Sequence, residues 1–153
     1  ERGYTSEQVL ISLDDRTSDR ERYILSQREQ ADLVVRWTPL SPLDWALTDL
    51  SPDLALTVQG LNTFNFTQLI RAMGTLSNLK VEHDPYTDIR WQSLHFTGSV
   101  SAAEIQAFAN ELVPNLDEIT LAPSFSGNLE GCLQLVFLIC LSDKLRWSDK
   151  HDD

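Results

Sequence analysis

Three prolines within residues 39–53 limit how this chain of 153 residues can fold (Pro39, Pro42 and Pro52). Proline lacks the backbone N–H that a helix interior or an inner strand requires, so no long regular element can cross this segment. Its leucines and its tryptophan still need apolar neighbours. We therefore expect a packed connection between two structured parts, residues 1–38 and residues 54–147, with an acidic tail over residues 148–153.

The part after this connection mixes strand and helix patterns. Leucine and valine alternate with small or polar residues from Leu54 to Leu61, and this alternation predicts a strand. Two more strands are predicted over residues 79–82 and 89–97, joined by a turn and ended by Gly98. A short fourth strand is predicted over residues 119–121.

Residues that commonly cap helices precede three apolar stretches of the same part. Asn65, Ser101 and Asn128 are each followed by apolar residues at helical spacing, so each is predicted to start a helix. The last of these helices is predicted to reach about Trp147, and it is apolar on nearly all sides between Leu133 and Leu141. Such a helix is either central and buried or part of a subunit interface.

The part before the connection reads as two helices and a strand. Thr5 and Gln8 have the spacing of a capping box, which predicts a helix to about Arg16, and Asp19 can cap a short helix over residues 21–25. Residues 31–38 are mostly apolar and resemble a strand that is buried in a parallel sheet. The predicted fold class is α/β, with an α+β C-terminal part in which helices pack a mixed sheet.

Charge and hydropathy restrict the partners that this chain can have. The net charge is −11, from 23 acidic and 12 basic residues, and a chain this acidic repels nucleic-acid backbones. The longest apolar run, Leu135 to Leu141, is far shorter than the roughly 20 residues that span a bilayer. We expect neither a nucleic-acid partner nor a membrane partner.

The two cysteines predict a reduced environment. Cys132 and Cys140 are eight residues apart in a helical stretch, which places them about 12 Å apart along the axis, too far for a disulfide within that helix. Cysteine in such a stretch more often serves as a small buried hydrophobe. A cytoplasmic location fits this use of cysteine best.

Arginines are concentrated at the start of the chain, where six of the 12 basic residues lie within the first 36 positions. Arg2 stands beside Gly3, just before a predicted helix start, so its guanidinium and free backbone N–H groups would favour a phosphate oxygen. The alternative is a solvated helix of mixed charge, because acidic residues are interleaved with these arginines.

Other polar residues show no self-contained catalytic pattern. The three histidines lack the spacing of a zinc site, and His95, within a strand, is interpreted as structural. Asp84 and Asp88 could hold a metal, but Pro85 between them favours turn capping. No Gly-rich phosphate loop with a following Lys-Ser/Thr pair occurs in the sequence, and no metal site is predicted.

The order of several short motifs in the first 36 residues resembles the phosphoribulokinase/uridine kinase family. The match consists of Glu1-Arg2-Gly3-Tyr4-Thr5, Asp15-Arg16 with Asp19, Tyr23-Ile24, Gln27-Arg28 and Ala31-Asp32-Leu33-Val34-Val35. A looser similarity to the C-terminal portion of phosphoribulokinase covers Ser93 to Gly98, Gly131 to Leu135 and Lys144 to Arg146. Two departures stand out, because Ser18 and Ser26 occupy positions where the family has proline.

This resemblance implies a P-loop kinase that transfers the γ-phosphoryl group of ATP to a hydroxyl group of a small molecule. Arg2 matches the lid arginine that such kinases direct at phosphates, so it is expected to be catalytic; Arg2, Arg16 and Arg28 are expected to bind substrate or phosphate. ATP and Mg²⁺ would be held by an N-terminal kinase core that carries the phosphate loop. We therefore expect a C-terminal fragment, with lid helices and one core strand over residues 1–38, that holds neither ligand and is inactive alone.

In a second interpretation, the chain has no catalytic function. Residues 54–147 would then form a regulatory or protein-interaction domain, and the kinase-like start would be a remnant without activity. Under the first interpretation, the C-terminal part could organise the sheet edge, bind an effector, or form a homodimer through the helix that contains Leu133 to Leu141. The acceptor substrate is left open by the sequence.

Overall fold

The computed structural model describes residues 5, 8, 11–12, 23, 25–42 and 53–148. The chain divides into two compact units, residues 1–34 and residues 35–153. In the first unit, the predicted capping box is confirmed. The Thr5 backbone N–H donates to Gln8 Oε1 at 3.0 Å, and the Gln8 N–H donates to Thr5 Oγ1 at 3.3 Å.

Helix α2 spans Leu25–Arg28 and shares Leu25 with the short helix predicted over residues 21–25. Of those predicted residues, 21, 22 and 24 lie outside the part of the chain that the structure describes. The Ser26 hydroxyl donates to the Tyr23 carbonyl at 3.1 Å. The predicted cap at Asp19 lies outside the described residues.

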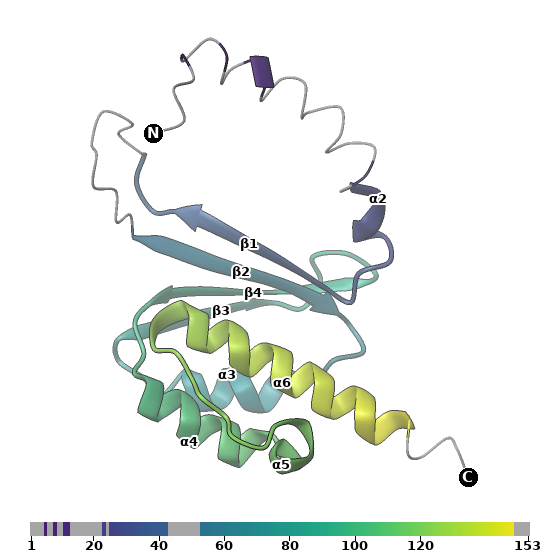
Figure 1. The fold of residues 1–153 in the computed structure, drawn as a ribbon, viewed down its shortest axis with the longest axis vertical. Helices are drawn as coiled ribbons and strands as arrows, with labels where there is room; N and C mark the ends of the chain where they lie inside the picture. Colours follow the sequence, from purple (N-terminus) through teal and green to yellow (C-terminus); the bar gives the residue numbers. More distant parts are fainter. Residues whose placement is uncertain are drawn as a thin grey trace. The chain divides into compact units, whose positions relative to one another are not determined.

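Four strands form one antiparallel sheet in the order β1-β2-β4-β3 (Figure 1). Their bounds are Leu33–Pro39 for β1, Leu54–Leu61 for β2, Leu79–Asp84 for β3 and Trp91–Gly98 for β4. Both β2 and β3 pair with β4, and the register places Phe96 opposite Leu56 and Val81. The prediction of a mixed sheet is therefore wrong, because β4 lies between β2 and β3 and runs antiparallel to both.

Strand β1 also differs from its prediction as a buried strand of a parallel sheet. It lies at an edge of the sheet, and its last four residues, 36–39, are exposed. Only Leu33 to Val35 form a continuous apolar run, and they are half-buried. Pro39 cannot donate a ladder hydrogen bond, so an edge position suits this strand better than an inner one.

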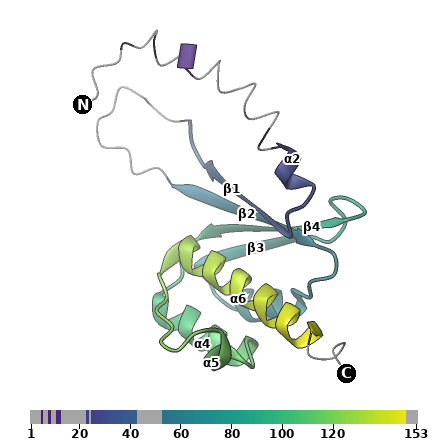
Figure 2. The same cartoon turned by 45° about the vertical axis from the view of Figure 1, so that its right-hand side comes forward.

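The helices that follow lie on one face of the sheet in both views (Figures 1 and 2). They are α3 (Thr67–Met73), α4 (Ala102–Leu112), α5 (Leu116–Ile119) and α6 (Asn128–Ser148). The Asn65 side chain accepts the Thr67 N–H at 3.0 Å, and Ser101 and Glu104 complete the predicted capping box of α4. The strand predicted over residues 119–121 is wrong, because the chain there closes helix α5 and Leu121 is fully exposed.

The core lies between this helix layer and the inner face of the two central strands. Each contributing side chain is almost completely buried, as the alternating and helical patterns predict. These side chains are Leu56, Val58, Leu94, Phe96, Leu69, Met73, Ile105, Ala109, Cys132, Leu135 and Val136. Gly98 ends β4 with a φ of 102°, where an added Cβ would lie 2.2 Å from the Asn78 carbonyl oxygen. Only glycine fits that turn.

Among the described residues, no helix is long and apolar enough to cross a membrane.

Candidate functional site

Of the three arginines that the sequence singles out, the structure places one. Arg28 is the last residue of α2, and its side chain is exposed. Arg2 and Arg16 lie outside the described residues. The grouping of these three arginines around a phosphate therefore stays a prediction.

A cavity of about 550 Å³ lies in the second unit, where β1 and β4 end and helix α6 begins. Its volume is within the range of small-molecule sites. Both apolar and polar residues line it: Trp37, Leu40, Asp53, Leu54, Gly98, Ser99, Asn128, Leu129 and Glu130.

Two local features bring these residues together. The Leu40 backbone N–H donates to the Asp53 carbonyl at 2.8 Å, which closes the connection between β1 and β2 beside the cavity. The Asn128 N–H donates to the Val100 carbonyl at 2.6 Å, and Asn128 adopts a left-handed φ of 58° at the start of α6. Asparagine tolerates this conformation better than most residues.

Negative charge distinguishes this cavity from a phosphate site. Asp53 and Glu130 contribute two carboxylates, and none of the described residues that line the cavity is basic. The N-terminus of α6 carries about half a positive charge, which these two carboxylates outweigh. The cavity therefore suits a neutral or cationic ligand, and the exposed indole of Trp37 offers a face on which a cation can lie.

A second cavity, of about 440 Å³, shares Ser99 and Asn128 with the first. Its other lining residues come from the α3–β3 turn and the start of α4: Thr75, Leu76, Ser77, Asn78, Val100, Ser101 and Glu104. Hydrogen bonds from the Ser101 side chain and backbone lower the pKa of Glu104, so this carboxylate is also ionised near neutral pH.

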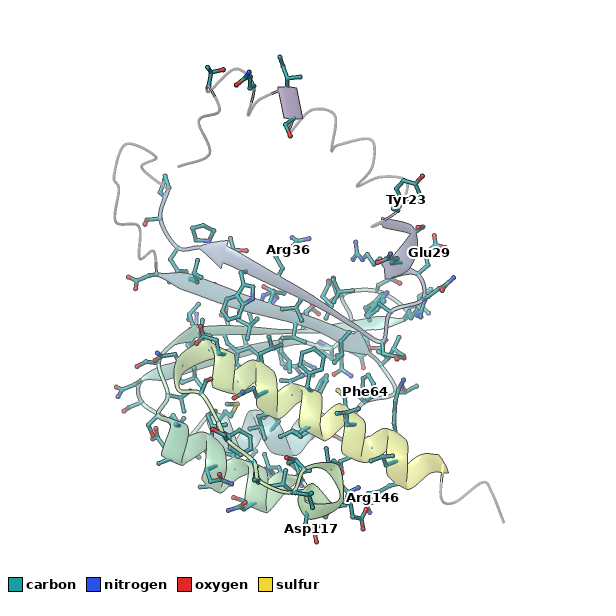
Figure 3. The ribbon with its side chains drawn as sticks, in the orientation of Figure 1. Tyr23, Glu29, Arg36, Phe64, Asp117 and Arg146 are labelled. Atoms are coloured by element: carbon teal, nitrogen blue, oxygen red, sulfur yellow. The ribbon has the colours of Figure 1, made fainter. Side chains whose placement is uncertain are left out.

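The face of the sheet opposite the helices carries polar groups that bond to one another. Across strands β2 and β4, Thr57 Oγ1 lies 3.0 Å from His95 Nδ1 and Gln59 donates to Ser93 Oγ at 3.3 Å. Within β3, Lys80 pairs with Glu82 at 2.8 Å. The hydrogen bond from Lys80 is the largest of the effects that lower the pKa of Glu82. Figure 3 shows Arg36 on this same side of β1, pointing away from α6.

The histidines in these strands have structural surroundings. Gln92 donates both of its side-chain N–H groups, to the carbonyls of Leu61 at 3.1 Å and Phe64 at 2.8 Å. Its Oε1 must therefore accept from His83 Nε2, at 3.0 Å. This pairing fixes the proton of His83 on Nε2 and ties β3 to the turn that leads into α3.

The remaining candidates for chemistry act as structural groups. Cys132 and Cys140 are buried thiols that do not form a disulfide. Burial raises the pKa of the Cys132 thiol to about 12, which makes it a poor nucleophile. Asp84 accepts the Tyr86 N–H at 3.1 Å, as the turn-capping interpretation predicts. In the described ranges, no group of three or more His, Cys, Asp or Glu residues is arranged to hold a metal ion.

Sequence reasoning missed the cavity residues because they come from four segments that are distant in the chain. Trp37, Asp53, Gly98 and Glu130 share no motif or spacing. Asn128 is a partial exception, because a polar residue before a long apolar stretch predicts a helix start, although it does not predict a cavity.

No family model matches the chain, and no similar protein was found among curated proteins or solved structures.

Proposed function

We propose that this chain is the C-terminal portion of an ATP-dependent small-molecule kinase that resembles the phosphoribulokinase/uridine kinase family. In this proposal, the segment before β1 supplies the lid helices, and residues 54–147 form an accessory module without catalytic groups. The kinase core with its phosphate loop holds ATP and Mg²⁺ in the cytoplasm. The 153 residues alone transfer no phosphate.

The observation that carries this proposal is the order of short motifs over the first 36 residues. An Arg-Gly-Tyr-Thr sequence, an Asp-Arg pair, Tyr-Ile, Gln-Arg and Ala-Asp before an apolar run occur in the family's order. The hydrogen bonds between Thr5 and Gln8 add structural support, because they form a helix start directly after the Arg-Gly pair in the sequence.

Arg2 has the chemistry that phosphoryl transfer requires at this position. Charge develops on the phosphoryl oxygens in the transition state, and a guanidinium close to them stabilises it with paired hydrogen bonds. Arg16 and Arg28 would then bind the phosphate of the substrate or of the nucleotide. The cavity at the start of α6 does not compete for this role, because its carboxylates repel a triphosphate.

The test is the turnover of a protein that contains both this chain and the phosphate loop, measured on sugar phosphates, nucleosides and small hydroxy acids. Replacing Arg2 by alanine is expected to lower kcat about a thousandfold, the lower end for an arginine that stabilises a transferring phosphoryl group. Arg2→Lys is expected to lose most of that rate too, since an ammonium cannot make the paired contact.

Arg71→Ala is the matched control, because Arg71 is an exposed arginine in the last turn of α3. It should leave kcat and the melting temperature unchanged. An unaltered kcat in Arg2→Ala, with folding intact, would remove Arg2 from the site and leave the kinase proposal without its central residue.

The alternative is a regulatory or interaction domain with no catalysis, and one observation favours it. The described part of the chain has a cavity of ligand size whose residues suit binding better than chemistry. Titration with an amine such as spermidine, followed by tryptophan fluorescence, tests it. A saturable signal that Trp37→Phe removes and Asp53→Asn weakens supports binding there; a signal that is equal in these variants contradicts it.

A further inference from the structure

Helix α6 keeps large apolar side chains on its outer side, although its inner side already fills the core. Leu135, Val136 and Ile139 are buried against the rest of the second unit. Phe137, Leu141 and Leu145 follow one another at intervals of four residues and are 42%, 46% and 46% exposed. Such a row on one helix face is typical of an interaction surface.

Two charged residues lie on the same side of the helix as Phe137 and Leu141, one before Phe137 and one after Leu141. Glu130 and Lys144 are both exposed. At about 100° per residue, Glu130, Phe137, Leu141 and Lys144 fall within an arc of about 60°. We call these four residues the outer stripe of α6.

The spacing of the charges is symmetric about Phe137. Glu130 precedes it by seven residues and Lys144 follows it by seven, so each lies about 10.5 Å from Phe137 along the axis. When a second α6 lies antiparallel with the two Phe137 rings at a two-fold axis, each Glu130 is opposite the Lys144 of the other copy. Leu141 is then opposite the half-buried Leu133 of the other copy.

Other arrangements of two such helices lose this match. A parallel pair in register places Glu130 beside Glu130 and Lys144 beside Lys144, and it also aligns the two helix dipoles. We propose that two copies of this chain associate through the outer stripe of α6 in this antiparallel, two-fold arrangement. An interface of one helix pair is small, so the dimer is weak and forms at micromolar or higher concentration.

The association constant of the whole chain is measured by sedimentation velocity over a range of concentrations. Phe137→Glu is expected to weaken association at least tenfold, because it places two carboxylates at the two-fold axis. Ile89→Glu is the matched control, since Ile89 is an equally large apolar residue, 99% exposed in the β3–β4 turn. It should leave association unchanged.

Charge reversal tests the antiparallel register. Glu130→Lys and Lys144→Glu, made singly, each create two like-charge contacts and should weaken association about tenfold. The double variant Glu130→Lys/Lys144→Glu restores both opposite-charge contacts and should associate as the original chain does. Lys144 makes other contacts as well, so replacing it could also change the fold. Circular dichroism of each variant tests whether its helices are kept.

Three results would overturn the proposal. A chain that stays monomeric at the highest concentration has no such dimer. A double variant weaker than either single variant excludes the register. Binding of the monomer to anionic phospholipid vesicles that Phe137→Glu removes would assign the outer stripe to a lipid surface instead of a second copy.

Discussion

Helices α4 and α6 pack on the same face of the sheet and contact each other, but they divide their apolar residues differently. In α4, Ile105 and Ala109 are buried, and the opposite side carries small and polar residues such as Glu104 and Glu111. Helix α6 buries one side just as completely and yet exposes Phe137 and Leu141 on the other. The comparison shows that the fold accounts for all of the apolar pattern of α4 and only part of that of α6.

The two helices also begin differently. Helix α4 starts with a complete capping box, formed within four consecutive residues by Ser101 and Glu104. Helix α6 starts at Asn128, whose backbone N–H is held by the Val100 carbonyl, 28 residues away. The first start is local, and the second depends on the assembled fold.

The largest difference in stability between buried and exposed helix positions is expected when core side chains are truncated. Leu135→Ala and Ile105→Ala should each lower the free energy of unfolding by about 2–5 kcal/mol, because both side chains are fully buried. Phe137→Ala should cost less than about 1 kcal/mol in the monomer, since it removes an exposed side chain. Urea denaturation at low protein concentration measures all three. Equal losses would mean that Phe137 belongs to the core after all.

A smaller effect is expected at Gly131, where α6 has no room for a side chain beside α4. A Cβ on Gly131 of α6 would lie 2.2 Å from the Ser126 carbonyl oxygen and 2.8 Å from Ile105 Cγ1 of α4. Gly131→Ala should therefore destabilise the fold by about 1–3 kcal/mol, despite the higher helix propensity of alanine. If this variant is as stable as the original chain in thermal unfolding, the contact between α4 and α6 is looser than the structure indicates.

Removing the local cap of α4 should cost less again. Ser101→Ala is expected to lower the free energy of unfolding by about 1 kcal/mol, and Ser124→Ala, at an exposed loop position, should have no effect.

The cap of α4 also predicts that stability depends on pH. The pKa of Glu104 is lowered from 4.5 in the fold, so its contribution is present above that value and is lost as the pH falls through the lowered pKa. Denaturation midpoints between pH 6 and pH 3 should fall less steeply in Ser101→Ala.

The last prediction concerns reactivity, at the buried thiol of Cys132 on the inner side of α6. With its pKa near 12 instead of 9.0, Cys132 has roughly a thousandth of the thiolate of an exposed cysteine at pH 8.5. In a Cys140→Ala variant, a disulfide reagent should modify Cys132 only as fast as the chain unfolds. Because the pKa is raised, the protonated thiol stabilises the fold below about pH 9, and this contribution is lost toward pH 12. Rapid labelling of the folded chain would show that the inner side of α6 is accessible.

The local signals of the sequence predicted most elements of the second unit. The alternation from Leu54 to Leu61 gave the bounds of β2, and the Ser101 and Glu104 pair gave the start of α4. Prediction failed where the signal was short or depended on partners. Residues 119–121 were too few to distinguish a strand from the end of α5, and the apolar run in β1 carried no information about the direction or number of its neighbours.

Within the described residues, then, the sequence alone determined the local cap of α4, the strand and helix periodicities, and the presence of more apolar residues in α6 than its inner side can bury. Each of these depends on residues less than about one helix length apart. The tertiary structure decided the antiparallel strand order and the edge position of β1. It also decided the meeting of Trp37, Asp53, Gly98 and Glu130 around one cavity. These features require chain segments dozens of residues apart to pack together, and packing is selected by the whole set of buried contacts, which no local pattern encodes.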